Sequence, residues 1–147
     1  MKDKKPIIRF AVFGDVHGKQ DDMFHKAQAY ENRHQKKINA ILQVGDFETI
    51  RTAEDFEFYF AKEKYRRISD IAQYMDGVRA VPIQTVFTGG NHEAWGVLKN
   101  SNGGGFICPL VYYLGRSGVV EVEGVKIGGL TGLYSQKHYN EPLGEPN

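Results

Sequence analysis

The sequence predicts an α/β fold in which a parallel βαβαβ core is followed by short antiparallel strands. Three apolar runs, at residues 7–13, 40–44 and 81–87, end at glycines (Gly14, Gly45 and Gly89-Gly90), which is typical of buried strands. Polar segments with apolar residues at helical spacing separate these runs. Strands that alternate with helices form right-handed crossovers and a parallel sheet. A length of 147 residues suits one domain, so we expect residues 1–147 to form a single domain.

Two helical segments are expected between these strands. The first covers residues 20–36, with acidic residues in its first turn and basic residues at its end, as the helix dipole favours. The second, at residues 53–75, carries a broken helical pattern that ends at Asp76-Gly77.

Short alternating segments follow residue 105. We expect strands at 111–114, 118–122 and 125–130, with Glu123-Gly124 as a hairpin turn between the last two. Residues 141–147 contain two prolines and no periodic pattern, so we expect a flexible tail there.

Composition excludes several classes of protein. Hydrophobic residues make up 41% of the chain, which excludes a disordered protein, and a net charge of +1 argues against nucleic-acid binding by bulk charge alone. Cys108 is the single cysteine, which excludes a disulfide framework and a four-thiolate zinc site. No apolar run approaches the roughly 18 residues of a membrane span. We therefore expect an intracellular protein, cytoplasmic or nuclear, with no membrane partner.

Each predicted core strand runs into a glycine followed by residues that can bind a metal. The three turns are Gly14-Asp15-Val16-His17-Gly18, Gly45-Asp46-Phe47-Glu48 and Gly89-Gly90-Asn91-His92-Glu93. Ligands bind at the carboxyl ends of the strands in an open parallel sheet, so these side chains can converge. Carboxylate and imidazole groups suit Mn, Fe and Zn. One such turn alone is ordinary loop chemistry, but three in this order favour a joint metal site.

These turns resemble the motifs of the calcineurin-like metallophosphoesterase superfamily. Further segments are similar to RNA lariat debranching enzymes, which hydrolyse the 2′,5′-phosphodiester at an RNA branch point; they lie at residues 64–66, 109–115 and 118–132. The resemblance covers nearly the whole chain. It implies a metallophosphoesterase-type sandwich, a phosphoester substrate that includes branched RNA, and two divalent ions (Mn, Fe or Zn).

The resemblance also implies a role for each residue. Asp15 and His17 would hold the first metal, Asp46 would bridge both metals, and Asn91 would hold the second. Two divalent ions can convert a bridging water into hydroxide and stabilise charge on the phosphate, so no protein nucleophile is required.

Two further residues would then act on the substrate. The resemblance implies that His92 stabilises charge on the phosphate or acts as general acid to the leaving oxygen. Glu93 would orient His92.

The chain departs from the family at two points. Debranching enzymes often carry cysteine at the position of Asp15. The superfamily also supplies later histidines, one pair in a Gly-His-x-His motif, whereas His138 is the only histidine after His92 here. The second metal is then left with Asp46 and Asn91, so we expect a C-terminally incomplete domain.

Three alternatives stay open at this point. The chain is a phosphodiesterase, a phosphatase or nucleotide phosphodiesterase of the same superfamily, or a truncated or split metal-binding fragment without activity. A fragment of that kind would need a partner chain that supplies the missing histidines.

A basic cluster at residues 62–67 allows two interpretations. It contacts the phosphates of RNA, or it is a solvated helix face paired with Glu63 and Asp70. Its members are Lys62, Lys64, Arg66 and Arg67.

Overall fold

The computed structural model describes residues 6–59, 61–99, 101, 103–134 and 136. In chain order the elements are β1 (Phe10–Phe13), α1 (Gln20–His34), β2 (Ala40–Val44), the 3-10 helices η1 (Ala53–Phe58) and η2 (Glu63–Tyr65), α2 (Ile71–Met75), β3 (Thr85–Thr88), α3 (Trp95–Lys99), β4 (Gly105–Cys108), β5 (Val111–Tyr113), β6 (Ser117–Val122) and β7 (Val125–Leu130). The predicted tail at 141–147 and His138 lie outside the described residues.

The main sheet has five strands in the order β1-β2-β3-β5-β4. The first four are parallel, and β4 pairs antiparallel with β5 at one edge. The parallel βαβαβ core is therefore confirmed, and β5 extends it. Four carboxyl ends of parallel strands consequently lie along one edge of this sheet.

Strands β6 and β7 form a separate antiparallel hairpin. Val122 pairs with Val125, so the predicted two-residue turn at Glu123-Gly124 is confirmed. Both turn residues have positive φ, 52° and 79°, as the tightest hairpin turns require.

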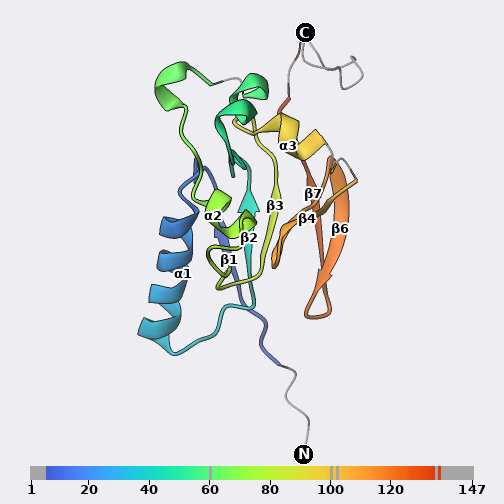
Figure 1. Cartoon of the computed structure of the whole chain (residues 1–147). Helices are drawn as coiled ribbons and strands as arrows, with labels where there is room; N and C mark the ends of the chain where they lie inside the picture. Colours follow the sequence, from blue (N-terminus) through green and yellow to red (C-terminus); the bar gives the residue numbers. More distant parts are fainter. Residues whose placement is uncertain (1–5, 60, 100, 102, 135, 137–147) are drawn as a thin grey trace, which may run out of the picture.

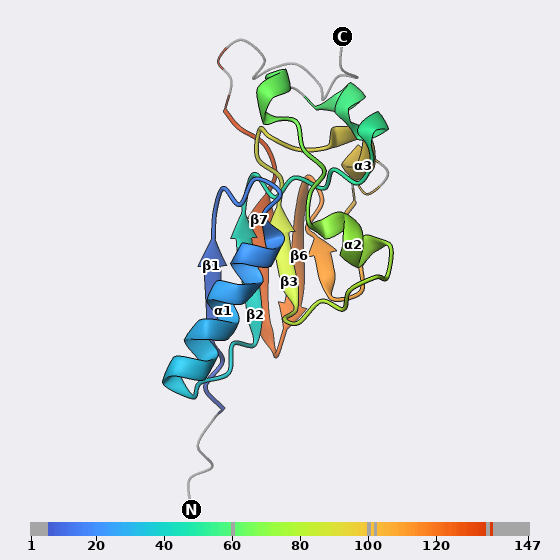
Figure 2. The same ribbon diagram turned by 60° about the vertical axis from the view of Figure 1, so that its left-hand side comes forward.

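The molecule has three layers. Helices α1 and α2 cover one face of the main sheet, and the β6–β7 hairpin covers the other (Figures 1 and 2). Buried side chains of the helix layer, such as Phe24 and Ile71, pack with Ile41 and Phe87 of the sheet. On the opposite face, Val122 of the hairpin belongs to a second cluster, whose buried members are Ala40, Val86, Leu114 and Val122. No helix in the described part of the chain is long and apolar enough to cross a membrane.

The prediction of a broken helix over residues 53–75 was wrong in one respect. These residues form three separate short helices, η1, η2 and α2. The carboxylate of Asp55 accepts hydrogen bonds from the backbone N–H groups of Arg51 (2.7 Å) and Thr52 (2.9 Å), which caps the N-terminus of η1. Tyr59 then packs in a cluster with Ile50, Ala94 and Val97 of α3 instead of continuing a helix face.

Several boundaries and two elements also differ from the prediction. Helix α1 ends two residues early, at His34, where Gln35 takes a left-handed conformation. Strand β3 begins at Thr85 and not at residue 81, and Pro82, which lacks an N–H group, lies in the loop before it. Helix α3 and strand β4 were not expected.

Candidate metal centre

The loops after β1 and β2 are joined along their backbones. The N–H of Asp15 donates to the carbonyl of Gly45 (3.1 Å), and the N–H of His17 donates to the carbonyl of Asp46 (3.0 Å). The loop after β3 joins them, because the N–H of His92 donates to Oδ1 of Asp46 (2.9 Å). The three turns singled out in the sequence therefore form one connected site at the carboxyl edge of the sheet.

Asp15, His17 and Asp46 form a group that could hold a metal ion. One ligand atom from each lies within 4.8 Å of the others. Nε2 of His17 is 3.8 Å from Oδ2 of Asp46 and 4.0 Å from Oδ1 of Asp15. Two carboxylates and one imidazole are a donor set that suits a divalent transition metal. The structure thus brings together the three residues predicted to hold the first ion.

The backbone at these three candidate ligands has an uncommon conformation. Asp15, His17 and Asp46 have φ values of 51°, 47° and 55°, in the left-handed region that non-glycine residues seldom adopt. Such conformations persist where the surrounding structure enforces them, which is common at functional sites. Here the hydrogen bonds between the first two loops supply that enforcement.

Gly90 allows the third loop to approach Asp46 closely. A Cβ atom on Gly90 would lie 2.1 Å from Oδ1 of Asp46 and 2.6 Å from its backbone nitrogen. Only glycine fits this approach without displacement of Asp46. Asn91, the next residue and the predicted ligand of a second ion, is exposed on the same loop.

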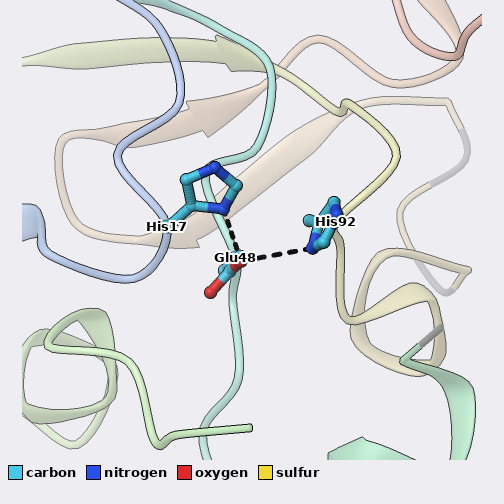
Figure 3. Close-up of side chains that lie close together, drawn as sticks. All are labelled: His17, Glu48 and His92. Carbon is cyan, nitrogen blue, oxygen red and sulfur yellow. Dashed lines mark hydrogen bonds and ion pairs between the residues drawn. The ribbon is translucent and has the colours of Figure 1, made fainter. Parts of the chain in front are cut away.

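A second group consists of His17, Glu48 and His92. Oε1 of Glu48 lies 2.9 Å from Nδ1 of His17 and 3.9 Å from Nδ1 of His92, as Figure 3 shows. The side chain of Glu48 is only 2% exposed. Sequence reasoning assigned no role to Glu48, although its place two residues after Asp46 was a signal that could have found it.

Tyr59 is a second residue of the site that the sequence did not reveal. Its hydroxyl donates to Oε1 of Glu48 (2.7 Å) and lies 3.4 Å from Nδ1 of His92. Burial, and then the hydrogen bond to Glu48, raise the pKa of Tyr59 well above its usual value. The phenol therefore stays protonated and serves as a donor.

The side chain of Glu93 is fully buried at the candidate metal centre. Its carboxylate accepts hydrogen bonds from the backbone N–H groups of Phe47 (2.9 Å), Glu48 (2.9 Å) and Gly90 (3.1 Å). Burial raises its pKa to about 8, and these hydrogen bonds oppose that rise. Glu93 thus joins the loop of Asp46 to the loop of His92 through backbone contacts.

The family model described as Calcineurin-like phosphoesterase matches residues 8–144 of this chain. Three relatives named lariat debranching enzyme show the range of similarity. The Arabidopsis thaliana protein is 37% identical over 132 residues, which are 90% of this chain and 32% of that protein. The Homo sapiens protein is 35% identical over 134 residues, which are 91% of this chain and 25% of that protein. The Entamoeba histolytica protein is 34% identical over 140 residues, which are 95% of this chain and 40% of that protein.

The chain therefore spans between a quarter and two fifths of the length of these relatives. The family match covers most of the sequence and includes all three loops of the site. The family match agrees with the parallel sheet and with the candidate metal ligands that follow its strands. The chain belongs to the calcineurin-like phosphoesterase family.

Proposed function

We propose that this chain is a metal-dependent phosphodiesterase and that its substrate is the 2′,5′-phosphodiester of branched RNA. The observation that carries the proposal is the convergence of Asp15, His17 and Asp46 at the carboxyl edge of the sheet. His92 lies beside this group, with its ring centroid 5.3 Å from that of His17. The names of the relatives favour branched RNA over other phosphodiesters.

Metal binding and action on the substrate would fall to different residues of the site. Asp15, His17 and Asp46 would hold one divalent ion, and Asp46 with Asn91 would hold a second. Bound divalent ions supply Lewis acidity and lower the pKa of the attacking water. Nδ1 of His92 faces Glu48 and Tyr59, which leaves Nε2 for the substrate. From that nitrogen His92 would stabilise charge on the phosphate or protonate the leaving oxygen.

Glu48 would act as a positioning residue in this scheme. A histidine that binds a metal through one ring nitrogen commonly donates the other N–H to a carboxylate, which fixes the tautomer and the ring orientation. The contact between Glu48 and Nδ1 of His17 has this form, and it leaves Nε2 of His17 toward Asp46. Tyr59 in turn donates to Glu48 and holds its carboxylate in place.

The proposal is tested by hydrolysis of bis-p-nitrophenyl phosphate and of a synthetic 2′,5′-branched RNA with added Mn²⁺. We expect both to be cleaved, and we expect chelation of the metal to stop the reaction. Asp46→Ala is the negative control, since it removes the carboxylate between the two predicted ions. Turnover no faster than this variant on both substrates would overturn the proposal. Faster cleavage of p-nitrophenyl phosphate than of either diester would instead indicate a phosphatase.

A second candidate function is metal binding without independent catalysis. The observation that favours it is the uneven donor set: among the described residues, one ion would have three protein ligands, and the second would have only Asp46 and Asn91. A partner chain would then contribute further histidines to the second ion. Calorimetric titration with Mn²⁺ distinguishes this candidate from the phosphodiesterase. One tightly bound ion per chain would support a metal-binding fragment without activity, and two tightly bound ions would contradict it.

A further inference from the structure

The segment from Lys62 to Arg66, here called the basic segment, lies exposed between η1 and α2. It contains three cations and one anion, Glu63, and includes the whole of η2. It lies beyond the carboxyl ends of the strands, in green at the top of Figures 1 and 2. This is the edge of the sheet that carries the candidate metal centre.

Contacts on both sides fix the basic segment beside that centre. Before it, the hydroxyl of Tyr59 donates to Glu48. After it, the guanidinium of Arg67 donates to the carbonyl of Gly18 (3.0 Å), and the N–H of Ser69 donates to the carbonyl of Ile50 (2.9 Å). Lys62 comes three residues after Tyr59, so at most about 11 Å of chain joins the two. The position of the basic segment on the rim of the site is therefore set by the fold.

The cations of this region differ in their partners. Arg67 pairs with Asp70 (3.1 Å), so the interpretation as a paired surface holds for that residue. Among the described residues, no carboxylate lies at ion-pair distance from Lys62, Lys64 or Arg66. Two of these cations lie over aromatic rings instead: Lys64 Nζ is 4.8 Å from the ring centre of Tyr65, and Arg66 Cζ is 5.8 Å from that of Phe56.

We propose that the basic segment binds the phosphate backbone of single-stranded RNA next to the phosphodiester that is cleaved. Unpaired cations that are held at the rim suit a polymer with one phosphate per nucleotide. Tyr65, whose side chain is 55% exposed, adds an aromatic ring on which a base can stack. This inference rests on the proposed function and names the part of the chain that would recognise the rest of the substrate.

The test measures binding and hydrolysis separately. A triple variant, Lys62→Gln with Lys64→Gln and Arg66→Gln, is titrated against a labelled single-stranded RNA of about 12 nucleotides by fluorescence anisotropy, with EDTA present to prevent cleavage. We expect the affinity to fall at least tenfold. We also expect the plot of log K against log salt to become shallower, its negative slope decreasing in magnitude by about 2. Each of the three lost phosphate contacts removes about 0.7 from that magnitude.

A matched control removes the same charge elsewhere. Lys26→Gln with Lys36→Gln and Lys37→Gln changes three exposed lysines of α1 and the loop that follows it, toward the opposite end of the sheet (Figure 1). This control is expected to keep most of the affinity, and both variants are expected to keep the urea midpoint of the wild type. An equal loss in the two variants would show that bulk charge binds the RNA and would overturn the proposal.

Two further measurements separate this inference from the proposed function. Cleavage of bis-p-nitrophenyl phosphate should change less than twofold in the basic-segment variant, because that small ester has no flanking phosphates. Binding of RNA that depends on the basic segment, without any hydrolysis, would support this inference and contradict the proposed function. Equal binding of a poly-glutamate peptide would show a general anion site and would overturn the assignment to RNA.

Discussion

Nδ1 of His17 lies 2.9 Å from Oε1 of Glu48, and the opposite ring nitrogen lies 3.8 Å from Oδ2 of Asp46. The imidazole is therefore held between a buried carboxylate on one side and the candidate metal ligands on the other. Only one carboxylate is needed to fix both the orientation and the tautomer of this ring.

Glu48→Gln should weaken metal binding while the fold is kept. Glutamine has the same size and can still accept a hydrogen bond from Tyr59, but it carries no charge toward His17. Loss of such a partner of a metal-binding histidine costs about 10–100-fold in metal affinity. Calorimetric titration with Mn²⁺ measures the change. Glu57→Gln, on the exposed side of η1, is the control and should bind Mn²⁺ as the wild type does. Equal affinity in both variants would show that Glu48 does not position His17.

Glu93→Gln should destabilise the chain and impair the metal centre together. The two carboxylate oxygens accept three backbone N–H groups, whereas a glutamine side chain offers one oxygen and a donor NH₂ group. At least one buried N–H is then left without a partner, which costs about 1–3 kcal/mol. Urea denaturation measures the loss of stability. A variant as stable as the wild type would contradict the role of Glu93 as the link between the two loops.

Much of the site could be predicted because parallel strands end at one edge of the sheet. Asp15, His17 and Asp46 lie directly after β1 and β2, so their strand positions alone brought them together. The role of Glu93 could not be predicted, since two of its three partners are backbone N–H groups 45 and 46 residues earlier in the chain. No side-chain pattern reports where a backbone donor will lie.

Tyr59 escaped prediction for a different reason. It follows η1, in the segment where a single broken helix was expected, and the direction of its side chain depends on how that irregular segment folds back. Its partner Glu48 is 11 residues away and belongs to a strand end, so helical periodicity carried no information on this contact. Regular elements were thus predictable from local patterns, and the contacts of irregular segments were not.

Gly90→Ala should lower both the stability of the fold and the affinity for Mn²⁺, although the change adds only one methyl group. The new Cβ would lie 2.1 Å from Oδ1 of Asp46, so Asp46 or the loop of Gly90 must move. Overpacking of this kind costs typically 1–3 kcal/mol, and displacement of Asp46 should also reduce Mn²⁺ affinity. Urea denaturation and calorimetry measure the two effects. Gly103→Ala is the control, because a Cβ there has no atom within 4 Å; similar stability in both variants would contradict the close approach.

Asp21→Asn should remove a pH-dependent part of the stability. Burial alone would raise the pKa of Asp21, but hydrogen bonds from Tyr74 (2.6 Å) and Arg79 outweigh it and hold the pKa below its usual value. A carboxyl group with a lowered pKa in the folded state stabilises the fold above its unfolded pKa of about 3.9. That contribution is lost as pH falls through the folded-state value.

The difference in unfolding free energy between the wild type and Asp21→Asn should therefore be present at about pH 7 and shrink below about pH 4. Hydrogen bonds to a charged group suggest a difference of about 1–2 kcal/mol at the higher pH. Urea denaturation over this pH range measures it. Asp22→Asn is the matched control, since Asp22 shares the first turn of α1 and its helix dipole but is exposed. If Asp22→Asn reproduced both the size and the pH dependence of the effect, the helix dipole would explain it, and the contacts from Tyr74 and Arg79 would not.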